Sequence, residues 1–400
     1  MRHRLRDTAL PVGVAFALGF ASLGTVQKYL GTSLALVYLA AVLVAVPLAV
    51  RFGAPLFSRV VSERSALWLA AATVLALVVV FFVVYPHAND HASTTVGGSD
   101  RDEDANLATN LLIRLHYPYD VTTYLGNHIT HLPGSLVLAI PFVLIGNSAY
   151  QNMFWLPALF AGLRVRTGSN SLALFWCWLL LAASPAVLRE YVTGGDLIAN
   201  GIYVLLATLG VLWAARRGGW VSIAAAAALG LTLSSRANYL LVLPLLASAL
   251  LQCSGRRRAA TDTVVALGVF LAVTLPFYLY DRAGFTPFHA ADKLSQFDAA
   301  LPHARVIILV LAVVLTLALT FTRMGVDGAA LARNAAIVQV FILVWAVGLD
   351  SDRAGHVTFF FLVSGYGLNV VFFALFALAA TVIRRRAGGE WAGEARLLGD

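Results

Sequence analysis

The sequence has few charged residues: 12% of its 400 residues are charged, 60% are hydrophobic, and the mean hydropathy is +0.81. An ordinary globular chain carries about 25% charged residues, so those present here are too few to solvate the surface of a soluble 42.7 kDa protein. A soluble enzyme is therefore excluded. Because a bilayer accepts runs of about twenty apolar residues, the composition indicates a polytopic membrane protein whose main partner is the lipid bilayer.

Cysteine and lysine are almost absent, with two residues of each. Cys177 lies within an apolar run and Cys253 beside the basic triplet 256–258, so a disulfide framework is excluded. The net charge of +8 comes from 26 arginines against 20 acids, and the arginines mark the ends of apolar runs. That pattern orients membrane helices and excludes the basic stripe of a nucleic-acid-binding protein.

Long apolar runs predict an all-α, polytopic transmembrane bundle of about 11–13 helices, organised as one membrane domain over residues 1–400. A transmembrane barrel would instead show alternating segments of about ten residues. The run 132–163 is long enough for two short helices around Asn147, and the arginines after it require an odd number of crossings, so we expect one crossing plus a re-entrant or partial helix. The runs fall near 9–26, 31–50, 67–86, 132–163, 170–187, 197–214, 220–234, 238–252, 262–280, 305–322, 335–349 and 357–383.

Arginine clusters predict which helix ends face the cytoplasm, because basic segments stay on that side of the membrane. We therefore expect a multi-pass protein of the plasma membrane whose segment 384–400 is a short cytoplasmic tail. The basic segments are the N-terminus, 51–64, 216–217, 256–258, 323–333 and 384–386. The segments expected to face outward are 87–131, 188–196, 281–303 and 350–356, which hold eight of the nine histidines.

The segment 87–131 is the one long polar stretch, with six acids, two arginines and five histidines. From Asp100 to Leu115, apolar residues recur at helical spacing, which predicts an amphipathic helix at the membrane surface. Its N-cap is expected at Ser99-Asp100, and Asp100 would lie with Asp104 at one edge of the apolar stripe, while Asp102 would project toward water. The first-turn carboxylates are expected to stay ionised, as bases, near the positive end of the helix dipole.

This polar segment also carries a series of motifs that resembles the first outer loop of a known superfamily. The motifs are Gly98-Ser99-Asp100-Arg101-Asp102-Glu103-Asp104-Ala105, Leu111-Leu112, Tyr117-Pro118-Tyr119 and Leu132-Pro133-Gly134, followed by a helix containing Pro141. They resemble the GT-C glycosyltransferases, which include protein mannosyltransferases, lipid A aminoarabinose transferases and actinobacterial mannosyl- and arabinosyltransferases. In that superfamily an acidic residue at the start of a surface helix is the catalytic base. The resemblance implies that role for Asp100, with Asp102 and Asp104 as the next choices.

Two later segments fit the same resemblance, which covers roughly residues 85–245 in detail. Members tend to carry an acidic residue in the second outer loop, which implies a role for Asp196, with Glu190 behind it. The Ser-Arg motif of many bacterial members is similar to the segment that contains Arg236, which reads Leu233-Ser234-Ser235-Arg236-Ala237-Asn238-Tyr239. Without the resemblance, Asp196 equally marks the start of a helix and Arg236 equally caps one at the membrane interface.

The resemblance implies transfer of a mannose- or arabinose-like sugar from a polyprenyl-phosphate donor to a lipid, glycan or protein acceptor on the outer face of the membrane. A carboxylate would take the proton of the acceptor hydroxyl while the anomeric carbon is attacked from the face opposite the phosphate, which inverts it. Asp104 or Asp196 would orient the acceptor. Arg236, with Lys293 or Arg282, would hold the leaving phosphate. The other expected substrate-binding residues are Tyr119, His128, His131 and Glu190.

Two alternatives stay open from the sequence. A divalent metal would find two ligands at His87 and His91 or at His128 and His131, but no third ligand is evident, so a reaction without metal or cofactor is expected. A membrane transporter, or a flippase for lipid or sugar, would need ionisable groups near the middle of the bilayer. The apolar runs are largely free of charge and the acids gather in one outer segment, which favours chemistry at the membrane surface.

Overall fold

The computed structural model describes residues 2–88, 99–325, 328–363 and 365–397, without the side chains of 2–8, 289–293, 363 and 384–397. Every regular element within these residues is helical, apart from one isolated bridge between Thr122 and His128. The all-α prediction is confirmed. The α-helices are α1 (Arg2–Leu30), α2 (Thr32–Leu48), α3 (Ala54–Val60), α4 (Glu63–Ala88), α5 (Arg101–Ile113), α6 (Pro133–Leu144), α7 (Gln151–Thr167), α8 (Asn170–Ala183), α9 (Pro185–Val192), α10 (Leu197–Ala215), α11 (Gly219–Leu233), α12 (Val242–Ser254), α13 (Arg256–Tyr280), α14 (Ala304–Thr320), α15 (Ala329–Ala354), α16 (Phe360–Val363) and α17 (Leu368–Leu397). The shorter π and 3-10 elements are η1 (Ala49–Gly53), η2 (Ser148–Tyr150), η3 (Ala237–Leu241) and η4 (Thr286–Phe297).

The helices suit a polytopic membrane protein. In the described part of the chain, seven helices are long and apolar enough to cross a bilayer, and two bent pairs raise the number of candidate spans to nine. Three shorter apolar helices, Gly219–Leu233, Ala304–Thr320 and Leu368–Ile383, bring the apolar elements to twelve, within the expected range. The seven long ones are Ala9–Leu30, Thr32–Val60, Glu63–Ala88, Leu197–Ala215, Ala237–Ser254, Arg256–Tyr280 and Ala329–Ala354.

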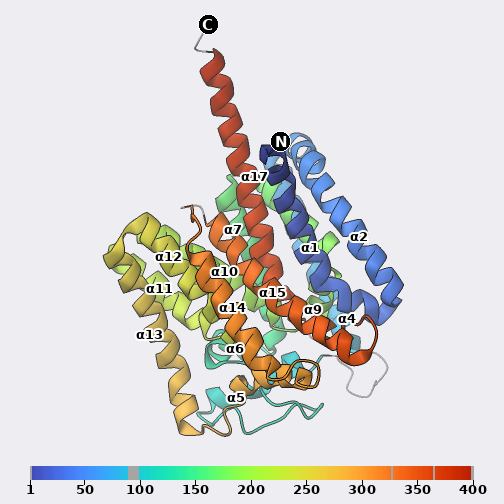
Figure 1. The fold of residues 1–400 in the computed structure, drawn as a ribbon, viewed down its shortest axis with the longest axis vertical. Coiled ribbons are helices and arrows are strands. Elements are labelled where there is room, and N and C mark those ends of the chain that lie inside the picture. Colours follow the sequence, from blue (N-terminus) through green and yellow to red (C-terminus); the bar gives the residue numbers. More distant parts are fainter. Residues whose placement is uncertain (1, 89–98, 326–327, 364, 398–400) are drawn as a thin grey trace.

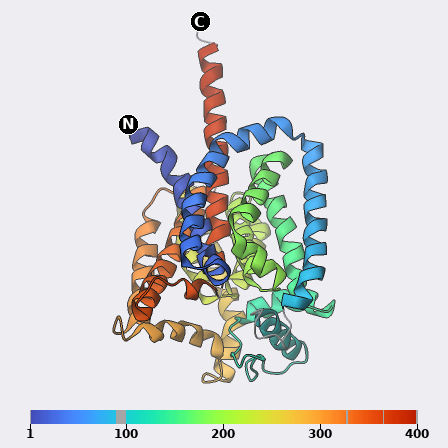
Figure 2. The ribbon, with the colours of Figure 1, turned by 90° about the vertical axis from the view of Figure 1, so that its right-hand side faces the viewer.

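The two ends of the bundle differ in what they carry. Figure 1 shows both termini at one end and α5 at the opposite end, and the perpendicular view in Figure 2 agrees. Between these ends the spans are not equivalent, because 72% of the apolar window of α10 is buried inside the protein, against 6% for α4. In Figure 2 the α4 helix stands at the margin of the bundle. The centre of the fold is therefore α10 with its neighbours, whereas α4 mainly faces the space that lipid would fill.

Two sharp bends bring polar residues to the α5 end. The pair α6 and Ser148–Thr167 is bent by 98°, where Gly146 has a φ of +125° and the side-chain oxygen of Asn147 accepts a hydrogen bond from the Ala149 amide. Two helical pieces around Asn147 were expected in the 132–163 run, and this expectation is confirmed. The pair α8 and α9 is bent by 86° at Ser184, directly before Pro185. Proline at a first helical position suits such a start because it has no amide hydrogen to leave unpaired.

The predicted helix of the polar segment is present as α5, and Asp100 lies at its N-cap position. Two details of the prediction were wrong. The side chain of Asp102 is 7% exposed and does not project toward water, because Tyr85 at the end of α4 covers it with a hydrogen bond. Leu115 was expected to continue the apolar stripe of the helix, but it lies beyond the last helical residue, Ile113, in the left-handed region at a φ of +60°.

Candidate functional site

Asp100 is the outermost carboxylate of the candidate site. Asp100 occupies the expected N-cap position of α5, but its side chain makes no capping hydrogen bond to the helix. Its Oδ2 instead accepts hydrogen bonds from Thr123 Oγ1 at 2.6 Å and from Asn127 Nδ2 at 2.8 Å. Both donors are neutral, and both come from the turn that crosses in front of the helix. Asp100 is half-buried, so part of this residue remains accessible.

Asp102 is more deeply buried than Asp100 and lies against the end of α4. Its Oδ2 accepts a hydrogen bond from Tyr85 Oη, which in turn accepts one from Asn147 Nδ2 at 2.6 Å. Burial raises the pKa of Asp102 to about 6, although the Tyr85 hydrogen bond opposes the rise. Desolvation thus makes Asp102 a stronger base than an ordinary aspartate, although a carboxyl group with this pKa is still mostly ionised at neutral pH, as expected for the first turn. A polar cavity of about 320 Å³ lies beside it, lined by Tyr85, Pro86, Asp102, Glu103, Asn106, Leu107 and Asn110.

Four side chains behind Asp100 form a buried ion-pair chain, consisting of Asp104, His131, Asp196 and Arg236. His131 Nδ1 lies 3.1 Å from Asp104 Oδ1, and His131 Nε2 lies 3.0 Å from Asp196 Oδ2. Arg236 donates to the same Asp196 oxygen at 2.6 Å and, through its other amino group, to Thr130 Oγ1 at 3.0 Å. His131 has no exposed surface, and the side chains of the other three are at most 10% exposed.

Within the ion-pair chain, opposite charges shift the pKa values of His131, Asp196 and Arg236 so that these three groups stay ionised. Burial alone would lower the pKa of His131, but Asp196 and Asp104 outweigh it and raise that pKa to about 9. Burial would raise the pKa of Asp196, yet Arg236 and His131 hold it well below its usual range. In the same way Asp196 outweighs the burial of Arg236 and raises its pKa further. At neutral pH Asp196 therefore carries its negative charge between the positive charges of His131 and Arg236, and this pairing is what buried ions require.

The strand-like segment that carries His131 is fixed from several directions. Tyr119 Oη donates to the His131 carbonyl at 3.1 Å, and the Gly134 amide donates to Ser234 Oγ at 3.0 Å. A Cβ at Gly134 would stand 2.3 Å from the Leu231 carbonyl oxygen. The start of α6 therefore approaches the end of α11 as closely as only glycine allows. This contact joins the segment of His131 to the one that carries Arg236.

A second ion pair joins α5 to α9. Arg101 lies 3.5 Å from Glu190 Oε1, and its guanidinium sits 5.5 Å from the ring centroid of Tyr366. Glu190 Oε1 also accepts the Leu197 amide at 3.2 Å, and so holds the start of α10. Gly194, at a φ of +73°, leaves room for the side chains of Ala149, Tyr85 and Asp102 to pack against the turn between α9 and α10.

The structure brings most of the expected site residues to one end of the bundle. Those that converge are Asp100, Asp102, Asp104, Tyr119, His131, Glu190, Asp196 and Arg236. His128 and Arg282 are exposed, and Arg282 lies over the ring of Tyr278 rather than at the ion-pair chain. The side chain of Lys293 lies outside the described residues.

Some residues of the site were not expected from the sequence. They are Tyr85, Arg101, Thr123, Asn127, Thr130, Asn147 and Tyr366, which hold the expected residues in place. Only the position of Tyr85, at the end of an apolar run directly before a proline, would have marked it. The others are common polar residues whose partners lie far away in the sequence.

The metal alternative finds a limited set of ligands. In the part of the chain that the structure describes, no three His, Cys, Asp or Glu side chains are grouped as a metal site would need. Of the two histidine pairs, His91 lies outside the described residues, and His131 is already held between Asp104 and Asp196 while His128 is exposed.

No family model, curated protein or solved structure matches the chain. Its chemical possibilities therefore follow from its own geometry. Asp100 offers an accessible carboxylate with neutral neighbours, and the ion-pair chain offers a rigid, charge-balanced support behind it. An accessible carboxylate in such a setting suits the removal of a proton from a hydroxyl group.

Proposed function

We propose that the protein is an inverting glycosyltransferase of the membrane, which moves a mannose- or arabinose-like sugar from a polyprenyl-phosphate donor to a lipid, glycan or protein acceptor. The observation that carries the proposal is the set of carboxylates at the start of α5, of which Asp100 is accessible and the others are held. The resemblance of the same segment to GT-C glycosyltransferases supports the same function.

In this reaction Asp100 is the base. Its free carboxylate oxygen takes the proton of the acceptor hydroxyl as the hydroxyl oxygen forms a bond to the anomeric carbon. The bond from that carbon to the phosphate oxygen breaks on the opposite face, so the configuration inverts, and the lipid phosphate leaves with the electron pair. Thr123 and Asn127 keep the carboxylate oriented, because both donate to its other oxygen.

The leaving phosphate needs a positive charge where its own charge develops. Arg236 is the candidate within the described side chains, because its Nε is buried without a hydrogen-bond partner and its charge is otherwise shared with Asp196. Lys293 and Arg282 are proposed as further cations from the 281–303 segment. Asp104 and Asp196 orient the acceptor indirectly, through the segment that carries His131.

The α5 end is proposed to face outward. The basic segments fall at the turns expected on the cytoplasmic side, and the positive-inside rule orients a bundle in that way. Nucleotide sugars stay in the cytoplasm, so an outward site would take its sugar from a lipid-linked donor. Residues 384–397 extend α17 at the end that carries both termini, which is the proposed cytoplasmic side.

A transporter or flippase is the second candidate, because one observation favours it. The two bent helix pairs meet near the site, and broken helices commonly form transporter binding sites. Those sites lie near the middle of the bilayer, whereas Asp196 immediately precedes α10 and Arg236 immediately follows the turn after α11. Charges at helix ends suit chemistry at the membrane surface better than a path across it.

The test is sugar transfer by the purified full-length protein in nanodiscs, offered a panel of polyprenyl-phosphate sugars and membrane glycolipids. Wild-type protein is expected to transfer one of these sugars with inversion, and Asp100→Asn is expected to remove the activity. Asp120→Asn is the matched control, because Asp120 is an exposed carboxylate of the same segment. Translocation of a lipid or sugar in liposomes, without transfer from any donor, would replace the enzyme by the second candidate.

A further inference from the structure

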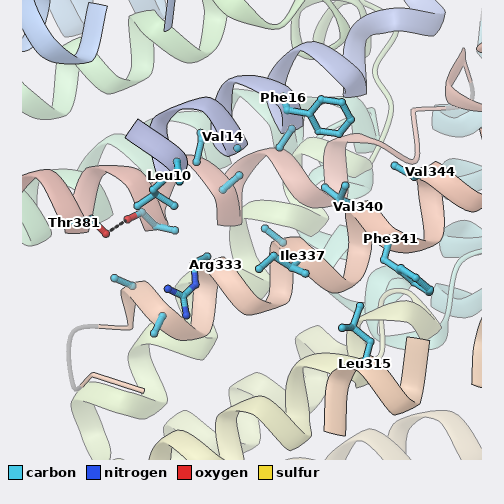
Figure 3. Close-up of a pocket in the computed structure, with 18 of the residues that line it drawn as sticks. Leu10, Val14, Phe16, Leu315, Arg333, Ile337, Val340, Phe341, Val344 and Thr381 are labelled. Atoms are coloured by element: carbon cyan, nitrogen blue, oxygen red, sulfur yellow. Dashed lines mark hydrogen bonds between the residues drawn. The ribbon is translucent and has the colours of Figure 1, made fainter. Parts of the chain in front are cut away.

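A large apolar groove runs along the other half of the molecule, away from the carboxylates. It lies between α1, α15, α17 and α14, and has a volume of about 1210 Å³ (Figure 3). Almost all of its lining is aliphatic or aromatic, including Leu10 and Val14 of α1 and Val340 and Val344 of α15. Ile337 and Val344 are more than 40% exposed. The groove is therefore open at the apolar surface that lipid would contact.

The polar groups of the groove gather at one end. Figure 3 shows Arg333 and Thr381 toward the end of the groove where α15 begins. The labelled side chains along the remainder of the groove are all apolar. The guanidinium of Arg333 makes hydrogen bonds only to the side-chain oxygen of the neighbouring Asn334, at 3.1 and 3.3 Å, and forms no ion pair within the described residues. Among the side chains that the structure describes, the polar part of the groove thus holds a positive charge without a counter-charge.

The part of the groove from Arg333 to Val344 matches the depth of one leaflet, and the lining continues past Arg333 to Ala329 at the start of α15. From Arg333 to Val344 the chain rises by 1.5 Å per helical residue, which gives roughly 16 Å. The hydrocarbon core of a bilayer is about 30 Å thick, so one leaflet is roughly 15 Å deep. Arg333 lies near the start of α15, at the end of the bundle that carries both termini. From Arg333 onward the groove therefore offers a cation and then an apolar wall about as long as one leaflet is deep. These features match a single lipid, with its headgroup at the cation and its acyl chains along the wall.

We propose that the groove binds one anionic phospholipid of the leaflet at the termini's end, with its phosphate at Arg333 and its acyl chains along α1 and α15. The uncompensated charge selects an anionic lipid over a zwitterionic one, since a single arginine near a membrane surface favours an anionic headgroup by about fivefold. This lipid lies at the end opposite Asp100, so it is separate from any donor at the carboxylate site.

Gly13 provides a direct way to fill the groove. It lines the groove, and a Cβ added there would meet no atom within 4 Å. The Cβ of a Gly13→Phe side chain therefore meets no protein atom, and its ring is expected to occupy the space of the lipid. Gly268 on α13 is the matched control, because it is equally exposed and equally free of neighbours but lies outside the groove. Arg333→Gln removes the charge, and Arg257→Gln, at an exposed arginine outside the groove, is its control.

The experiment uses full-length protein taken from vesicles of equal parts phosphatidylglycerol and phosphatidylcholine into mild detergent, with retained lipid counted by native mass spectrometry. We expect one retained phosphatidylglycerol per wild-type or Gly268→Phe chain, and loss of that lipid from Gly13→Phe. Arg333→Gln is expected to lose the roughly fivefold preference for phosphatidylglycerol, whereas Arg257→Gln keeps it. Equal retention by Gly13→Phe and Gly268→Phe, or an unchanged preference in Arg333→Gln, would overturn the proposal. So would a wild-type dimer that Gly13→Phe dissociates, because a second copy would then cover the groove.

Discussion

The start of α5 and the ion-pair chain behind it hold their carboxylates in opposite ways. Asp100 is half-buried and accepts hydrogen bonds from two neutral side chains, and no cation in the described part of the chain forms an ion pair with it. Asp196 is buried between Arg236 and His131, at 2.6 and 3.0 Å. The two groups are chemically identical, yet only Asp100 is reachable by an external hydroxyl group.

The difference separates a group that can act from groups that hold the fold. A carboxylate between two buried cations has its pKa held well below the usual range, so it does not take up a proton near neutral pH. It is also costly to remove, because its cations cannot return to water. Substitution of Asp100 should therefore lower the rate of sugar transfer, whereas substitution of Asp196 should lower the stability of the fold.

The largest expected effect is on catalysis, at Asp100. Replacement by asparagine keeps the size of the side chain and an oxygen for Thr123 and Asn127, but removes the base. We expect sugar transfer to fall by about a hundred- to ten-thousand-fold, as for general bases elsewhere, while the unfolding temperature stays near that of the wild type. Transfer rates in nanodiscs and thermal unfolding of the same preparation measure both.

The control for this prediction is the exposed Asp120 of the same segment. Asp120→Asn should leave both transfer and unfolding unchanged, because this carboxylate is at the surface. If Asp100→Asn transfers sugar at the wild-type rate, Asp100 is not the base. Asp102, whose pKa is raised to about 6, would then be the next carboxylate to replace.

The next effect is on stability, at Asp196. Asp196→Asn leaves the buried cations Arg236 and His131 without the carboxylate between them. Breaking a buried ion pair in this way costs about 3–5 kcal/mol, which should appear as a large fall in the unfolding temperature with or without substrate. Loss of transfer without loss of stability would assign Asp196 to catalysis instead of support.

The matched carboxylate for Asp196 is Asp350, which is buried but paired with a half-exposed Arg353 at 3.0 Å. After Asp350→Asn the arginine can turn into water, so we expect a loss of about 1 kcal/mol or less. Equal losses at Asp196 and Asp350 would show that burial of the cation does not decide the cost.

Part of this site could be predicted from the sequence. The polar segment differs in composition from the rest of the chain, helical spacing predicted α5, and its start at Asp100 was correct. The outward direction of Asp102 was wrong, because periodicity describes one helix and not its neighbours. Tyr85 reaches Asp102 from α4, and Asn147 reaches Tyr85 from the bend after α6. No local pattern links these three residues.

The apolar part of the fold shows the same limit. Hydropathy predicted the helices but could not say which of them form the centre, because lipid chains and a protein core are equally apolar. The windows of α10 and α4 pass the same test, yet 72% of the first and 6% of the second are buried. The polar residues Asn200 and Thr208, both fully buried on α10, are the local sign of its central position.

A smaller effect is expected from pH, through His131. Its pKa is raised from 6.5 to about 9 in the folded protein, so its contribution to stability is complete below pH 6.5 and is lost as the pH rises through about 9. Asp102 has finished its own titration by then, since its pKa is about 6. Unfolding temperatures measured from pH 6 to pH 10 should fall across that window.

The pH prediction is sharpened by comparing two histidines of the same segment. His116 is exposed and lies outside the ion-pair chain, so His116→Gln should leave the pH dependence unchanged. His131→Gln should flatten it, at the cost of a lower stability at every pH. A wild-type profile that is flat between pH 6 and pH 10 would mean that His131 is not charged between its two carboxylates.

The smallest effect is expected from the neutral hydrogen-bond donors that orient the Asp100 carboxylate. Thr123→Ala removes one of the two hydrogen bonds to its Oδ2, at 2.6 Å, and leaves the one from Asn127. A single hydrogen bond of this kind contributes about 1 kcal/mol, so kcat should fall about fivefold while KM is nearly unchanged, because the base becomes less well oriented. Thr123→Ser keeps the hydroxyl group and should restore most of the rate. If Thr123→Ser is as slow as Thr123→Ala, the methyl group of the threonine packs the turn, and the hydroxyl does not orient Asp100.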